Sequence, residues 1–175
     1  EDYYLTLGAS IADFPVLGND TAKIFAGLGI HTVEHLLLAY SQFVADELKR
    51  PGISAQTVRL WQSHMSLMCF VPGVSLNDAQ VLAANDITSP EALFNADARL
   101  VAAEIDKFLR TDRGRRFASL RSRYTRDRIA ELQQFARTHR KRWQEAREHF
   151  TWLERPTRPA PAEATYSGAR RAPAS

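Results

Sequence analysis

The chain has 175 residues, of which 45% are hydrophobic and 25% charged, a composition that fits one folded domain with extensions or two small ones. No apolar run approaches the roughly 18 residues that a membrane-spanning helix needs, and no signal-peptide pattern is present, so we expect no membrane partner. The single cysteine, Cys69, excludes an intrachain disulfide and agrees with a cytoplasmic location.

The net charge of +3 conceals two halves of opposite sign. Residues 1–109 hold 6 Lys and Arg against 13 Asp and Glu, whereas residues 110–158 hold 15 against 6. This asymmetry predicts either a polyanionic partner for the basic half or attraction between the two halves. The chain begins with Glu1 rather than methionine, so we expect it to be a piece of a longer protein.

Two segments of the acidic half align without a gap, with Phe14 set against Val71 and Leu37 against Phe94. The first is FPVLGNDTAKIFAGLGIHTVEHLL, residues 14–37, and the second is VPGVSLNDAQVLAANDITSPEALF, residues 71–94. Each copy predicts a helix, a tight turn at Gly29 or at Asn85-Asp86, and a second, short helix. The linking segment 48–68 predicts a helix, a turn at Pro51-Gly52 and another helix.

The short helix of each copy begins at a capping pattern. In the second copy, TSPE at 88–91 predicts Thr88 as the N-cap and Glu91 as the acid that reaches back to the free N–H. HTVE at 31–34 occupies the same positions in the first copy. The predicted buried face of that first short helix is Val33, Leu36, Leu37 and Tyr40.

The segment HTVEH at 31–35 also matches the H-x-x-E-H spacing of a class of zinc peptidases. Such a site needs both histidines within a regular helix and a third ligand farther along the chain. His31 falls at the predicted N-cap, where the backbone is not helical, and the second copy has Thr88 and Ala92 in place of the histidines. We therefore expect a structural cap here and no metal.

These segments resemble the helix-hairpin-helix class, and more closely a bacterial family of domains of unknown function built from tandem helix-hairpin-helix-like units. The resemblance covers about residues 10–110 and implies an all-α fold with no assigned reaction. In that class a Pro-Gly-apolar-Gly turn presents backbone N–H groups to a DNA phosphate. The resemblance implies such contacts at Gly18 and Gly73, but each turn keeps only one of the two glycines and no cation follows it. Helix packing is therefore the favoured role of the hairpins.

Residues 110–128, RTDRGRRFASLRSRYTRDR, give the strongest nucleic-acid signal in the chain. Arginine suits phosphate, and the interleaved Phe117 and Tyr124 could stack on bases. The alternative is a solvated helical surface whose arginines pair with acids of the first half. The candidate nucleic-acid-binding residues are Arg113, Arg115, Arg116, Arg121 and Arg123, together with Gly18 and Gly73.

A long helix is predicted from about Thr125, with a seam of side chains at alternating spacings of three and four. The seam is Ile129, Leu132, Ala136, His139, Trp143, Ala146, Phe150 and Leu153. At ~1.5 Å per residue the helix would span roughly 45 Å, so part of it should project or pack on another chain. We expect one end to dock on the helical domain, and we expect Trp143, Phe150 and His139 to contact a partner, with self-association as the next alternative.

The predicted organisation is an all-α chain in five parts. Residues 1–9 lead into a first unit at 10–70, a second unit at 71–110, the Arg-rich segment and long helix at 111–154, and a disordered tail or linker at 155–175. We predict a non-catalytic binding or scaffold module of a larger bacterial protein, which acts through protein contacts. DNA binding is the alternative function. No catalytic residue, metal or cofactor is predicted.

Overall fold

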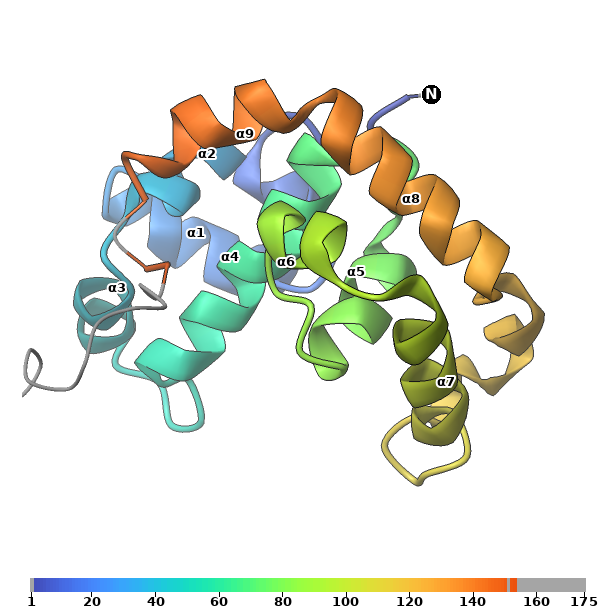
Figure 1. Ribbon diagram of the computed structural model, residues 1–175. Coiled ribbons are helices and arrows are strands. Elements are labelled where there is room, and N and C mark those ends of the chain that lie inside the picture. Colours follow the sequence, from blue (N-terminus) through green and yellow to red (C-terminus); the bar gives the residue numbers. More distant parts are fainter. Residues whose placement is uncertain (1, 151, 154–175) are drawn as a thin grey trace, which may run out of the picture.

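The computed structural model describes residues 2–150 and 152–153, and within these ranges the chain is helical, with one isolated β-bridge between Ser10 and Thr32. The predicted all-α class is confirmed (Figure 1). The predicted tail at 155–175 lies outside the described residues. The elements are η1 Ile11–Asp13, α1 Gly18–Gly27, α2 Val33–Leu38, α3 Ser41–Leu48, α4 Ala55–Phe70, α5 Leu76–Ala84, α6 Pro90–Asn95, α7 Ala98–Phe108, η2 Arg115–Arg123, α8 Arg126–Thr138 and α9 Arg140–Arg147.

Helices α1 to α3 recur as α5 to α7 in the register of the sequence alignment. Helices α2 and α6 match in that register at both ends, and α3 and α7 match at their first residues. The turn before each short helix holds its backbone at positive φ, 81° at Gly29 and 69° at Asp86. Glycine and aspartate adopt this left-handed conformation more readily than most residues, so the turns take equivalent shapes with different residues.

A buried glutamine ties each hairpin to the helix that follows it. Gln62 on α4 donates from Nε2 to the carbonyl oxygens of Leu36 and Ala39 at 2.9 and 3.1 Å. Gln133 on α8 donates in the same way to Leu93 and Ala96. Each pair of carbonyls belongs to the C-terminal end of the short helix, where the helix leaves oxygens without internal partners. Helix α8 therefore makes the same hydrogen bonds to the second hairpin that α4 makes to the first.

The second unit is longer than the first between its hairpin and its glutamine. The interval from Ala98, the first residue of α7, to Gln133 exceeds the interval from Ser41, the first residue of α3, to Gln62. Most of the additional length falls between α7 and α8, in the Arg-rich segment that contains η2, and the rest makes α7 longer than α3. After the Arg-rich segment the two units have the same register again, because the N-cap Ser54 precedes Gln62 by the same number of residues as the N-cap Thr125 precedes Gln133. The Arg-rich segment is thus an insertion into the second of two similar units.

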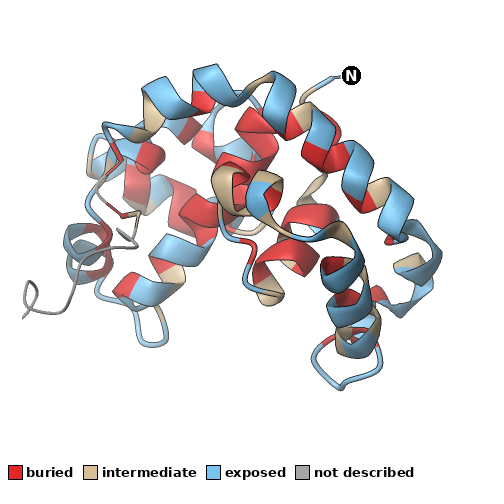
Figure 2. Cartoon of the chain, viewed as in Figure 1, coloured by how far each residue is buried: buried red, intermediate tan, exposed pale blue. Residues whose placement is uncertain are grey.

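Helix α4 is the centre of the molecule, because residues 61–70 are buried without interruption. A helix that is buried on every side belongs to the core of its domain. Helices α8 and α9 run over α4, α6 and α7 and so join the two units (Figure 1). The buried residues of α8 and α9 lie on the side of these helices that faces the rest of the molecule, and the outer side is exposed (Figure 2). None of the helices in the described ranges has the length and apolar character needed to cross a bilayer.

The predicted caps of the short helices were wrong by one residue. The N-caps are Thr32 and Ser89, whose hydroxyl oxygens accept from the N–H groups of His35 and Ala92 at 3.1 Å. Because Pro90 occupies the first helical position, the residue before it must be the cap. Glu34 and Glu91 are consequently not the cap acids. Tyr40, expected on the buried face, is 62% exposed.

The long terminal helix was also predicted incorrectly. It breaks at His139, where ψ is 16°, and α9 ends at Arg147. The ring of Tyr3 packs edge-on against His139 at the break, with 6.0 Å between ring centroids. The bend allows α8 to follow the second unit and α9 to reach α4, so the seam packs on its own chain and no part of it within the described residues projects.

Candidate functional site

The HTVEH segment is a helix cap in the structure. His35 Nδ1 accepts hydrogen bonds from the backbone N–H groups of His31 and Thr32 at 3.0 and 3.2 Å. The first-copy capping box therefore uses a histidine where the glutamate was expected. Within residues 2–150 and 152–153, no three His, Cys, Asp or Glu side chains are grouped so that they could hold a metal ion.

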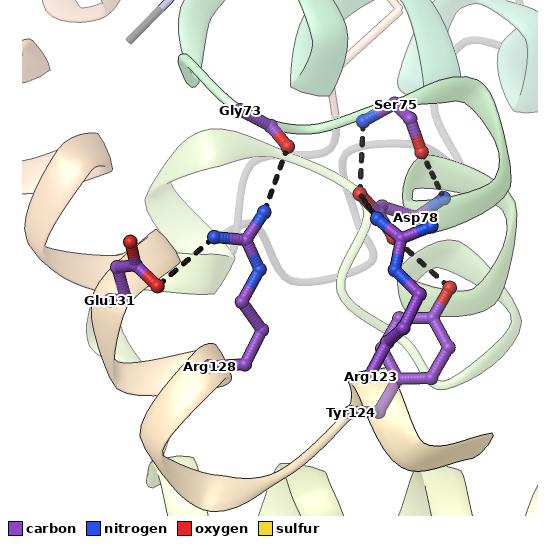
Figure 3. Close-up of polar contacts among 7 residues, drawn as sticks. All are labelled: Gly73, Ser75, Asp78, Arg123, Tyr124, Arg128 and Glu131. Atoms are coloured by element: carbon purple, nitrogen blue, oxygen red, sulfur yellow. Dashed lines mark hydrogen bonds and ion pairs between the residues drawn. The ribbon is translucent and has the colours of Figure 1, made fainter. Parts of the chain in front are cut away.

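The second hairpin turn has its backbone groups occupied from within the chain (Figure 3). The N–H of Gly73, at φ 86°, donates to the carbonyl of Asp2 at 3.1 Å, and its own carbonyl accepts from Arg128 at 3.2 Å. At the start of α5, Ser75 and Asp78 form a reciprocal capping box, with distances of 3.0 and 3.2 Å. The N–H groups of this turn, which the resemblance assigns to a DNA phosphate, thus donate to the carbonyl of Asp2 and the carboxylate of Asp78.

Asp78 is only 2% exposed, and the inserted segment closes over it. Tyr124 donates its hydroxyl to Asp78 Oδ1 at 3.0 Å, and Arg123 approaches Oδ2 at 3.4 Å, so both close on the same carboxylate (Figure 3). Burial, followed by the charge of Asp78, raises the pKa of Tyr124 above its usual range. We call Asp78, Arg123 and Tyr124 the Asp78 clamp. It fixes the Arg-rich segment to the N-terminus of α5.

The first hairpin turn is more open. Gly18, at φ 77°, starts α1 and is exposed, and no side chain of the described residues caps this helix end. Asp20 lies exposed in the first turn, so an anion at this end would meet a negative charge. Gly18 and Gly73 therefore differ in environment, although both have positive φ.

The predicted arginines differ in the groups that they contact within the chain. Arg121 contacts Asp106 at 2.7 Å, Arg115 contacts Asp112 at 2.7 Å, and Arg123 belongs to the Asp78 clamp. The hydrogen bond from Arg121, together with the charge of Arg110, lowers the pKa of Asp106 below its usual value. Arg113 and Arg116 lie over the rings of Phe108 and Phe117, 5.7 and 4.2 Å from the ring centroids.

The predicted partner contacts are part of the core, and this prediction is corrected. Trp143 is 1% exposed and Phe150 3% exposed, and both pack edge-on against Phe70. His139 is half-buried at the break between α8 and α9, with Nδ1 3.0 Å from the carbonyl oxygen of Phe135. These side chains hold α9 to α4 and offer no exposed anchor to another chain.

A groove of about 1010 Å³ lies between the two units. One wall is the outer face of α4, and the opposite wall runs from the end of α5 through the turn to α6. The end of α9 and the residues after it form the third side. Hydroxyl and amide side chains predominate, among them Ser54, Gln56, Thr57, Ser63, Thr88, Ser89 and Asn95.

The apolar part of the groove consists of Leu60, Trp152 and Leu153, with Ala83 and Ala92. Trp152 is anchored, because its Nε1 donates to the carbonyl of Leu37 at 2.9 Å and its ring stacks on Phe150. Leu60 is different, because it is 44% exposed in this concave wall. When Gln62 is aligned with Gln133, the residue of α8 that corresponds to Leu60 is Glu131, so the fold itself does not need an apolar side chain there.

The charged part of the groove consists of Arg59, Arg147, Asp86 and Glu91. Arg147 is 22% exposed and contacts Glu91 Oε1 at 2.7 Å through one terminal nitrogen. Its Nε is buried and has no hydrogen-bond partner among the described residues. A planar guanidinium can donate along two edges, so Arg147 has donor capacity that Glu91 does not use.

The groove residues were not singled out from the sequence. The ungapped comparison stopped before α4 and α8, which align only when the Arg-rich insertion is skipped. Aligning residues 54–65 with residues 125–136 would have matched the N-caps and the glutamines. It would also have set Leu60 opposite Glu131 and so marked an apolar residue at a solvent-facing position.

Neither the curated proteins nor the solved structures give a match to this chain. A family match covers residues 15–139, from the first hairpin turn to the break between α8 and α9. It therefore spans both units, both buried glutamines and the Arg-rich insertion. On this evidence the chain belongs to the family described as Domain of unknown function (DUF4332).

Proposed function

We propose that this chain is a non-catalytic helical binding module that holds a segment of a partner protein in the groove between α4 and α6. The observation that carries the proposal is Leu60, which is 44% exposed inside a concave wall. A concave surface with apolar side chains and a few polar groups that fix orientation is typical of binding sites. The seam of α8 and α9 has no part in this proposal, because it is buried.

Binding rather than chemistry is favoured by where the perturbed side chains lie. Burial lowers the pKa of His64 to about 4 and raises the pKa of Cys69 to about 12. Tyr124 is held in the Asp78 clamp. These side chains are 5%, 1% and 6% exposed and belong to the core, whereas catalytic groups with shifted pKa values need access to a substrate.

We further place the two units in the helix-hairpin-helix class and the protein in a bacterial cytoplasm. The support for the class is the pair of helices in each unit, joined by a turn of positive φ at Gly29 or Asp86. The support for the location is the single cysteine, buried in α4.

The groove can be tested with a peptide library displayed on phage and selected on the full chain. We expect enriched peptides whose binding is lost in Leu60→Glu, because a buried carboxylate would meet the apolar contact of the ligand. Leu100→Glu is the matched control, since Leu100 is 62% exposed on α7 and lies outside the groove. Equal loss in both variants, or no enrichment at all, would refute the proposal.

Nucleic-acid binding through the Arg-rich segment is the alternative function. It is supported by Arg113 and Arg116, which have no ion-pair partner among the described residues and lie over aromatic rings. Titration of duplex and single-stranded DNA near 50 mM and 200 mM salt tests it, because phosphate contacts weaken steeply with salt. Binding that is insensitive to Arg113→Ala and Arg116→Ala would exclude this segment as the interface.

A further inference from the structure

Among the described residues that line the groove, Arg147 is the one with a buried donor that has no acceptor. It meets Glu91 through one terminal nitrogen at 2.7 Å, while its Nε has no acceptor among the described residues. A donor that is shielded from water and lacks an acceptor is unfavourable, and a charged donor gains most from a carboxylate. Arg147 lines the groove and its side chain is 22% exposed, whereas Nε itself is buried, so an acceptor from a ligand would reach Nε only after the guanidinium reorients. The geometry therefore favours a second acceptor that comes from a ligand.

The surroundings of Arg147 restrict the kind of ligand. Ser63 and Thr88 add hydroxyl donors, and Arg59 adds a second cation on the α4 wall. Leu60 and Leu153 provide an apolar surface in the same groove. Asp86 and Glu91 would repel a polyanion such as nucleic acid, whose charge repeats along its whole length. A short segment with single acidic side chains avoids this repulsion.

We infer that the groove binds a partner segment in which an acidic side chain lies beside an apolar one, with Arg147 as the anchor of the carboxylate and Leu60 as the contact of the apolar side chain. This inference rests on the proposed function of the groove. In the free protein, Glu91 is the internal competitor for Arg147. Binding would therefore add an acceptor to Arg147 or displace Glu91 from it.

Three fluorescein-labelled nonapeptides of glycine and serine test the inference by fluorescence anisotropy on the full chain. Each carries one leucine and, beside it, one glutamate, one lysine or one glutamine. We expect the Leu/Glu peptide to bind at least about tenfold more tightly than the Leu/Lys peptide. Arg147→Gln should weaken the Leu/Glu peptide roughly ten- to hundredfold, the range expected for one charge-assisted hydrogen bond. Arg115→Gln is the control for non-specific attraction, because Arg115 is 77% exposed outside the groove.

Glu91→Gln separates a ligand anchor from a structural ion pair. If Arg147 anchors the ligand, removal of the competing carboxylate leaves the affinity for the Leu/Glu peptide unchanged or raises it. If the pair only supports the fold, Glu91→Gln and Arg147→Gln weaken binding alike. The peptide comparison on the native chain and the Glu91→Gln variant decide the question even if Arg147→Gln does not fold.

The inference is overturned if the Leu/Lys peptide binds as well as the Leu/Glu peptide, or if both variants lose affinity together. It is also overturned if a synthetic peptide of the chain's own residues 154–175 binds more tightly than the Leu/Glu peptide, or if groove variants abolish self-association of the chain. Selected peptides that bind through Leu60 without an acidic preference would refute the inference alone. Absence of any selected peptide would refute the proposed function as well.

Discussion

The buried glutamines Gln62 and Gln133 allow a comparison of two similar sites within one chain. Gln62 makes three hydrogen bonds, to the carbonyls of Leu36 and Ala39 and from the hydroxyl of Ser41 to its Oε1 at 2.8 Å. Gln133 makes the two carbonyl bonds only, because Ala98 occupies the position of Ser41 in the second unit. The substitution to methionine keeps the shape of the side chain and removes its polar atoms. The two variants therefore measure the same contact with and without the hydroxyl.

We expect Gln62→Met to lower the free energy of unfolding by about 3–5 kcal/mol and Gln133→Met by about 2–3 kcal/mol. Each lost hydrogen bond contributes about 1 kcal/mol to these values. The remainder is part of the desolvation cost of the buried carbonyls, which stay without a donor. These are large fractions of the ~5–15 kcal/mol that a typical domain has. Urea unfolding followed by far-UV circular dichroism gives the values through the shift in midpoint.

Ser41→Ala tests whether this accounting is correct. In the native background it leaves Gln62 Oε1 without its donor and should cost about 1 kcal/mol. In the Gln62→Met background the hydroxyl of Ser41 has lost its acceptor, so its removal should cost nothing or stabilise the protein. The coupling should therefore be about 1 kcal/mol or more. The reasoning is refuted if Ser41→Ala costs the same in both backgrounds, or if Gln133→Met is the more damaging of the two methionine variants.

Three further predictions concern buried polar groups. Tyr124→Phe removes the hydroxyl that donates to Asp78 at 3.0 Å in the Asp78 clamp, and it should lower the free energy of unfolding by about 1.5–3 kcal/mol. Amide exchange near the N-terminus of α5 should become faster. An unchanged urea midpoint would contradict this prediction. His64 has a folded pKa of about 4 against an ordinary 6.5, so its neutral form stabilises the protein above pH 6.5 and that contribution is lost as the pH falls towards 4. Over that window wild type should lose about 3 kcal/mol more unfolding free energy than His64→Gln, and parallel stability curves of the two proteins would refute the assignment. Cys69 is 1% exposed with a raised pKa, so alkylation by iodoacetamide at pH 8 should proceed only at the rate of unfolding, and reaction as fast as that of a free thiol would exclude the buried position.

Local sequence signals predicted the two hairpins because their causes are local. The ungapped register of the two copies, the apolar periodicity and the turn residues together indicated α2 and α6 and the left-handed positions at Gly29 and Asp86. The N-caps were wrong by one residue because the capping pattern was aligned on Glu34 and Glu91. In the structure His35 takes the role of the box acid, and Glu91 contacts Arg147 instead. A side chain that serves a distant contact can thus imitate a local motif.

The terminal helix was predicted incorrectly because a regular seam does not specify what it packs on. Alternating spacings of three and four continue through His139 without a break, yet the helix bends there. The bend depends on contacts that are distant in sequence, Tyr3 on His139 and Phe70 on Trp143. With the bend, Trp143 and Phe150 complete the core around α4, which is why they cannot act as exposed anchors. The candidate groove was not predicted because its walls come from both units and the end of α9, which are distant from one another in the sequence.

Part of the charge asymmetry of the chain is accounted for by ion pairs between its two halves. Arg121 contacts Asp106, Arg123 contacts Asp78 and Arg147 contacts Glu91, each joining the basic half to the acidic half. A sequence count cannot separate such arginines from those that face solvent, because their partners lie far away along the chain. The Arg-rich segment is also an insertion that covers the second hairpin turn, whereas no segment of the described residues covers the first turn in this way. A cluster of arginines therefore indicates a polyanion site only after its internal acids are known, and here they leave Arg113 and Arg116 as the residues on which a DNA interface would depend.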